Sequence, residues 1–142
     1  MEKIFVDMNY LTFCWQDDNQ QAIYYLDKDT GSIILIQDDL EDVEEMRTEI
    51  ELEPSRYLFI PKQELKHTEL DLSDFVNTVQ DATIKGALAV ALEQREKLFA
   101  ARAVFKNHPD ELARWDKFRG EAARSRVRRW LAINGVEAME QE

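Results

Sequence analysis

The stretch that decides the fold is residues 22–36, AIYYLDKDTGSIILI. Two runs rich in β-branched and aromatic residues flank a polar loop at residues 27–31, and such runs favour β-strands. Gly31 supplies the positive φ angle that a short hairpin loop requires. The stretch therefore predicts a β-hairpin. The apolar run at residues 56–61, RYLFIP, predicts a third strand, which Pro61 ends because proline has no backbone N–H.

Apolar residues recur at helical spacing through most of the remaining sequence. The predicted helices begin at or near Asp7, Asp38 or Asp39, Ser73, Asp81 and Asp110. The aromatic residues after Asp7 fit a strand equally well. The last of them runs to Ile133 and stops at Asn134-Gly135. We therefore expect an α+β fold in which a small antiparallel β-sheet, the hairpin plus a third strand, packs on a C-terminal helical bundle.

The length of 142 residues favours a single domain that covers residues 1–142. Within it we expect an acidic, sheet-containing half at residues 1–71, a helical half at 72–136 and a frayed tail at 137–142. Neither a membrane-spanning run nor a secretion signal is expected from the sequence, and the single cysteine suits a reducing compartment. The expected location is the cytoplasm.

Charge is distributed unevenly along the chain. Residues 1–71 hold 18 acidic and 6 basic side chains, whereas residues 72–142 hold 11 acidic and 12 basic ones. Residues 38–53 contain nine acids and one base, Arg47. The opposite pattern occurs at residues 119–129, where five arginines accompany Glu121. Each patch is interpreted as a solvated helix face, as half of an intramolecular match between the two, or as a binding surface for an oppositely charged partner. The intramolecular match is the preferred structural prediction.

The sequence lacks the motifs of common catalytic and metal sites. Its four glycines are widely spaced, so it has no glycine-rich phosphate loop. One cysteine, Cys14, and two histidines, His67 and His108, cannot assemble a structural zinc site. Cys14 lies among aromatic residues and is interpreted as a packing residue. We therefore predict no catalytic residue, metal or cofactor, and a non-enzymatic protein; an enzyme of another class would require a deep polar pocket.

Several short motifs are similar to those of a known family. They are Tyr24-Tyr25-Leu26-Asp27 with Thr30-Gly31, Arg56-Tyr57-Leu58-x-Ile60-Pro61, Asp74-Phe75, Ala91-Leu92-Glu93-x-Arg95, His108-Pro109, Trp115-x-x-Phe118-Arg119 and Trp130-Leu131. Together they cover nearly the whole chain, which resembles the bacterial proteins of uncharacterised protein family 0158. The resemblance implies a shared fold, and it implies no reaction.

Two functional hypotheses follow from the charge pattern. In the first, an acidic face binds a basic protein partner; its residues are Asp38, Asp39, Glu41, Asp42, Glu44 and Glu45. In the alternative, the arginine-rich C-terminal helix binds nucleic acid through Lys117, Arg119, Arg124, Arg126, Arg128 and Arg129, with Trp115 and Phe118 as possible stacking groups. The strongly acidic chain favours the first hypothesis, because its net charge of −11 repels phosphate. Trp115 and Phe118 also fit a buried stripe.

Overall fold

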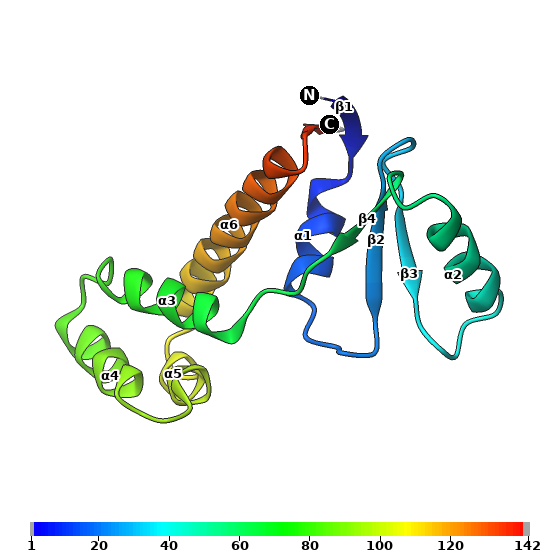
Figure 1. Cartoon of the computed structure of the whole chain (residues 1–142). Coiled ribbons are helices and arrows are strands. Elements are labelled where there is room, and N and C mark those ends of the chain that lie inside the picture. The colour runs from blue at the N-terminus through cyan, green and yellow to red at the C-terminus, as the bar shows by residue number, and fades with distance from the viewer. Residues whose placement is uncertain (1, 141–142) are drawn as a thin grey trace. The chain divides into compact units, whose positions relative to one another are not determined.

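The structure is a computed structural model that describes residues 2–140. Its α+β fold confirms the predicted fold class. Figure 1 labels the elements, which in chain order are β1 (Glu2–Val6), α1 (Met8–Gln16), β2 (Ile23–Asp27), β3 (Ile33–Ile36), α2 (Val43–Leu52), β4 (Tyr57–Ile60), α3 (Leu65–Val76), α4 (Ala82–Leu92), α5 (Lys97–Phe105), α6 (Pro109–Ile133) and β5 (Val136–Glu140).

The chain forms two compact units, each with its own hydrophobic core. The sheet unit holds the described residues up to Gln63 and those from Ala123 onward. The helical unit holds residues 64–122, so α6 contributes residues to both. The boundary expected after residue 71 lies inside α3, because that helix begins at Leu65.

The predicted hairpin and third strand form one antiparallel sheet with the strand order β3-β2-β4. Side chains alternate between the two faces of a strand, so Tyr24 and Leu26 of β2 share a face with Ile60 of β4. These three side chains are buried in a core that also contains Leu11 of α1 and Leu131 of α6. The inner face of the sheet thus packs on α1 and on the C-terminal part of α6.

A second sheet joins the two ends of the described chain. Strand β1 pairs in parallel with β5, so that Glu2 lies opposite Val136 and Val6 lies opposite Glu140. The prediction of a frayed tail is therefore wrong for residues 137–140; residues 141 and 142 lie outside the described part of the chain. The strand is held because Ala138 packs against the core of the sheet unit and Glu140 bonds to two arginines of α6.

The helical unit is organised around a cluster of aromatic rings. Phe75 of α3 contacts Phe105 of α5 and both Trp115 and Phe118 of α6, with ring centroids 5.5–6.1 Å apart. Trp115 is only 5% exposed. Its burial confirms the packing interpretation of this tryptophan, which is therefore not a stacking platform for nucleic-acid bases.

Two of the expected helix starts in this unit can be compared with the structure. Asp81 caps α4, since its carboxylate accepts hydrogen bonds from the backbone N–H groups of Thr83 and Ile84. The start expected at Ser73 is wrong, because Ser73 lies within α3. Serine is a common N-cap residue, but α3 begins eight residues earlier, at Leu65.

Gly31 is the residue whose lack of a side chain the hairpin needs most. Its φ angle is +77°, a conformation that residues with a Cβ rarely adopt. A Cβ at this position would also lie 1.9 Å from the carbonyl oxygen of Phe5 in β1. The glycine therefore permits both the turn and the close approach of the β1 backbone.

We predict that Gly31→Ala destabilises the protein by about 3 kcal/mol or more, because the methyl group adds backbone strain to a clash with a backbone atom. Gly86→Ala is the matched control, since Gly86 is an exposed residue of α4 and a methyl group added there would meet no atom within 4 Å. The control should gain about 0.5–1 kcal/mol from its better helix propensity. Urea unfolding measures both, and equal stability of the two variants would contradict this role for Gly31.

Candidate functional site

The predicted acidic face lies in the connection between β3 and α2 and in the first turn of α2. All six of its side chains are exposed: Asp38, Asp39, Glu41, Asp42, Glu44 and Glu45. The helix begins at Val43 and not at Asp38 or Asp39, because the preceding residues form a turn that ends at Asp42 with a φ angle of +62°. The six acids are therefore shared between a turn and a helix.

One base lies within the acidic face. Arg47 donates one hydrogen bond to Asp38 and another to Glu44, at 2.5 Å and 2.7 Å. Hydrogen bonds with these two carboxylates raise the pKa of Arg47. Within residues 2–140, the remaining four acids of the face, Asp39, Glu41, Asp42 and Glu45, have no cationic partner. The face therefore keeps most of its negative charge.

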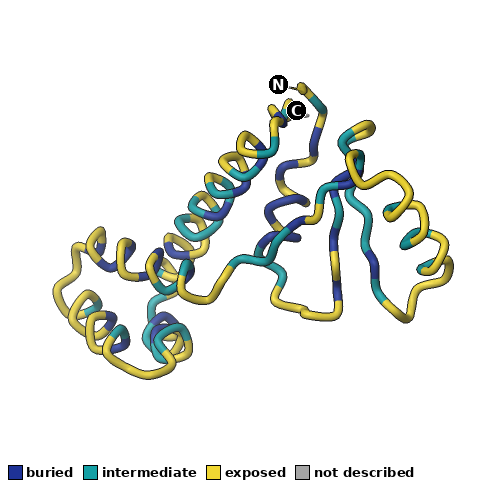
Figure 2. The backbone as a smooth tube through the Cα atoms, in the orientation of Figure 1, coloured by how far each residue is buried: buried dark blue, intermediate teal, exposed yellow. Residues whose placement is uncertain are grey.

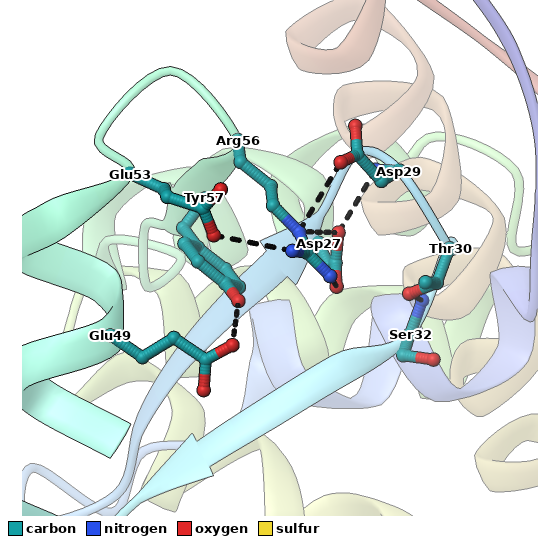
Figure 3. Close-up of polar contacts among 8 residues, drawn as sticks. All are labelled: Asp27, Asp29, Thr30, Ser32, Glu49, Glu53, Arg56 and Tyr57. Carbon is teal, nitrogen blue, oxygen red and sulfur yellow. Dashed lines mark hydrogen bonds and ion pairs between the residues drawn. The ribbon is translucent and has the colours of Figure 1, made fainter. Parts of the chain in front are cut away.

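A cluster around Arg56 fixes α2 to the sheet (Figure 3). Its guanidinium group donates two hydrogen bonds to the carboxylate of Asp27, at 3.0 Å and 2.9 Å. Asp27 is only 5% exposed and lies at the end of β2. The same guanidinium group bonds to Glu53, just after α2, at 3.2 Å and lies 3.4 Å from Asp29 in the hairpin loop. Arg56 thus joins the hairpin loop, the end of α2 and the start of β4.

Neighbouring bonds extend this cluster. The hydroxyl group of Tyr57 donates to a carboxylate oxygen of Glu49 in α2, at 2.9 Å. The Asp27 carboxylate also accepts the backbone N–H of Asp29, which orders the loop. The hydrogen bonds from Arg56 lower the pKa of Asp27 and oppose the rise that burial causes. The ionised carboxylate is therefore the form that the fold stabilises.

The outer face of the three-stranded sheet lies beneath α2. Figure 2 shows that α2 is largely exposed, and none of its residues is buried. Arg47, Ile50 and Glu51 of α2 line a cleft of about 190 Å³ together with Ile23, Tyr25 and Ile36 of the sheet. The helix therefore covers part of the outer face and leaves a depression beside it.

The six residues of the predicted nucleic-acid face lie along α6: Lys117, Arg119, Arg124, Arg126, Arg128 and Arg129. Lys117 and Arg119 belong to the helical unit and the other four to the sheet unit. Arg119 lies over the ring of Trp115, 5.7 Å from its centroid. Arg124 bonds to Asn9 and to Glu140, at 2.9 Å and 2.8 Å, and Arg128 bonds to the same carboxylate of Glu140.

These contacts correct the expected match between the acidic and basic patches. Arg124 and Arg128 form ion pairs with Glu140 of β5. The base that forms ion pairs within the acidic face is Arg47. The match is therefore wrong for Arg124 and Arg128. The sequence alone does not indicate this partner, because Glu140 lies on β5, a strand that is defined by its long-range pairing with β1.

The structural role of Arg56 and the exposure of Phe59 were not predicted from the sequence. The run that contains both residues predicts a strand and indicates no role for its first residue. A basic residue that precedes an apolar strand could have been paired with one of the acids of the hairpin loop, but the sequence offers Asp27 and Asp29 equally. Only the antiparallel register, which places Tyr57 opposite Asp27, selects the partner.

Other groups that could support chemistry are dispersed or buried. Burial raises the pKa of the Cys14 thiol to about 11, so the thiolate is scarce near neutral pH. Within the described residues, no group of three or more histidine, cysteine, aspartate or glutamate side chains could hold a metal ion. None of the helices formed by residues 2–140 has the length and apolar character needed to cross a membrane.

The fold and this surface define an α+β protein of two compact units that displays an exposed acidic face above an apolar sheet. Its motifs resemble one family throughout, and the family model matches residues 3–142. The chain belongs to the uncharacterised protein family UPF0158.

Curated relatives carry the same family name. A UPF0158 protein of Chlamydia pneumoniae is 28% identical over 125 residues, which cover 86% of this chain and 38% of the relative. UPF0158 proteins of Chlamydia trachomatis serovar D and Chlamydia muridarum are 27% and 26% identical over the same length, 86% of this chain and 37% of each relative. This chain thus spans less than two fifths of these relatives. No solved structure matches it significantly.

We predict that Asp27→Asn weakens the loss of stability in acid. Because the pKa of Asp27 is lowered by folding, its ionised form contributes stability that is full above the ordinary value of 3.8 and is lost as the pH falls from there through the folded-state pKa. The variant is less stable near neutral pH, but its free energy of unfolding should decrease less steeply than that of the natural sequence below about pH 4. Urea unfolding at a series of pH values measures the slopes.

Leu26→Ala is the control for this experiment, since it removes a buried side chain from the same strand without removing a carboxylate. It should lower stability at every pH and keep the slope of the natural sequence. An Asp27→Asn slope equal to that of Leu26→Ala would show that the Asp27 carboxylate is not stabilised in the fold.

Proposed function

We propose that this protein is a non-enzymatic, cytoplasmic interaction module that recognises a basic partner protein through its acidic face. The observation that supports the proposal is the exposure of Asp38, Asp39, Glu41, Asp42, Glu44 and Glu45, with Arg47 as the base bonded within the face. Carboxylates that pair inside a protein stabilise its fold, whereas unpaired exposed carboxylates remain available to a partner.

An acidic face of this kind chiefly changes the rate at which the protein associates with a charged partner. Several like charges on one surface attract an oppositely charged partner over roughly 10 Å at ordinary ionic strength, and salt weakens that attraction. Electrostatic complementarity raises the association rate and excludes partners of the wrong sign. Binding by this face should therefore be strongly dependent on salt and selective for lysine- or arginine-rich segments.

Nucleic-acid binding by α6 is the alternative, and fewer observations favour it. Arg124 and Arg128 share the carboxylate of Glu140, and its bonds with them lower the pKa of Glu140. Trp115 is buried and Phe118 packs on the same aromatic cluster. A phosphate backbone would have to compete with an existing anion for the two arginines, so we rank this alternative second.

We predict that a random-peptide display library selected on the immobilised protein is enriched in lysine- and arginine-rich sequences at low ionic strength and loses that enrichment at high ionic strength. The triple variant Asp39→Lys, Glu41→Lys, Glu45→Lys should abolish the enrichment. It should keep the melting temperature of the natural sequence, because these three acids have no cationic partner among the described residues.

The matched control is Asp18→Lys, Glu93→Lys, Glu96→Lys, which changes the net charge equally at positions outside the acidic face. It should retain the enrichment. Equal loss in both triple variants would show that overall charge matters and not this face. Retention of DNA or RNA on a filter at low salt, without selection of basic peptides, would favour the alternative.

A further inference from the structure

The outer face of the three-stranded sheet carries an apolar surface. In the antiparallel register Tyr25 of β2 lies opposite Ile34 of β3 and Phe59 of β4, so these side chains share the face opposite the core. Ile23 and Ile36, also opposite each other, belong to the same face. The rings of Tyr25 and Phe59 meet edge to face, with centroids 5.7 Å apart.

Two of these side chains are exposed to solvent. Phe59 is 52% exposed and Ile23 is 37% exposed. An isolated exposed apolar side chain needs no explanation, but these two flank Tyr25 and adjoin the cleft beneath α2. Phe59 adjoins the cleft through its ring contact with Tyr25, and we term the whole feature the sheet cleft: Ile23, Tyr25, Ile36, which is only 3% exposed, Ile50 and Phe59.

The size of the cleft indicates the kind of occupant. Sites for small molecules enclose roughly 300–1,000 Å³. The cleft under α2 measures about 190 Å³, which is smaller than that range. A depression of this size suits a single side chain presented by a larger partner.

The charged residues around the cleft indicate which residues flank that side chain in the partner. Arg47 lines the cleft but is already bonded to Asp38 and Glu44. Glu49 accepts a hydrogen bond from Tyr57, whereas Glu51 lines the cleft, is exposed and has no cationic partner within the described residues. The cleft thus has one acid without a cationic partner, Glu51, and Arg47 connects the cleft to Asp38 and Glu44 of the acidic face.

We propose that the sheet cleft receives one bulky apolar side chain of a basic partner segment, while flanking lysine or arginine residues of that segment contact Glu51 and the acidic face. This inference rests on the proposed function and specifies the class of partner: a protein segment with an apolar residue between basic ones. The apolar side chain provides the anchor, because exposed ion pairs contribute little affinity and buried apolar contacts at the centre of an interface contribute most of it.

Three labelled peptides test the inference by fluorescence anisotropy on the full chain. The first is a lysine-rich peptide with one central phenylalanine, the second has serine in place of phenylalanine, and the third has glutamate in place of every lysine. The first should bind about tenfold more tightly than the second. The third should not bind.

The protein variant Ile23→Ser with Phe59→Ser should remove the preference for phenylalanine and leave the affinity for the serine peptide unchanged. Both residues are exposed, so the fold should tolerate the change. Phe13→Ser with Leu65→Ser is the matched control, because these exposed apolar residues lie on α1 and α3 and not on the sheet. The control variant should keep the preference.

The outcomes separate this inference from the proposed function. Equal, salt-sensitive binding of the first two peptides would overturn the sheet cleft as an anchor and leave the acidic-face proposal standing. Failure of both lysine-rich peptides to bind, or binding of the glutamate peptide, would overturn both. Loss of the phenylalanine preference in the control variant as well would also overturn the assignment to the cleft.

Discussion

The two hydrogen bonds between Arg56 and Asp27 are the centre of a cluster that connects the hairpin, the end of α2 and the start of β4 in the sheet unit. Asp27 ends β2, and its carboxylate is buried, so the fold requires a cation beside it. Arg56, the residue before β4, provides that cation. Its planar guanidinium group also bonds to Glu53, which follows α2. The hairpin, the acidic helix and the third strand are thereby held at one point. The position of the acidic face above the sheet is a consequence.

Helix α2 is therefore exposed and is attached to the sheet mainly by polar bonds at its C-terminal end. The helix has no buried residue, so apolar packing alone holds it weakly. Polar bonds at its C-terminal end, from Tyr57 to Glu49 and from Arg56 to Glu53, supply much of its attachment. Its N-terminal turn and the preceding loop are left free to display carboxylates. A surface that is anchored at one end and charged at the other is suited to meeting a partner.

Local sequence patterns predicted the features that depend on residues close to one another in the sequence. The hairpin follows from its strand-forming runs and Gly31, α4 follows from its cap at Asp81, and the acidic face follows from composition. The pairing of β1 with β5 could not be predicted, because it joins residues more than 130 positions apart, and neither could the bond of Arg124 to Glu140, which lies in that paired strand. The outward orientation of Phe59 required the register, since a shift of one residue would have turned it toward the core.

A double-mutant cycle on Asp27 and Arg56 tests the central role of their ion pair most directly. The free energies of unfolding of Asp27→Asn, Arg56→Gln and the double variant are measured by urea denaturation near neutral pH and compared with that of the natural sequence. If the pair holds the sheet unit together, the double variant should be about as stable as the less stable single variant, since either change alone already breaks the pair. Strictly additive losses would show that the two side chains act independently and would contradict the account.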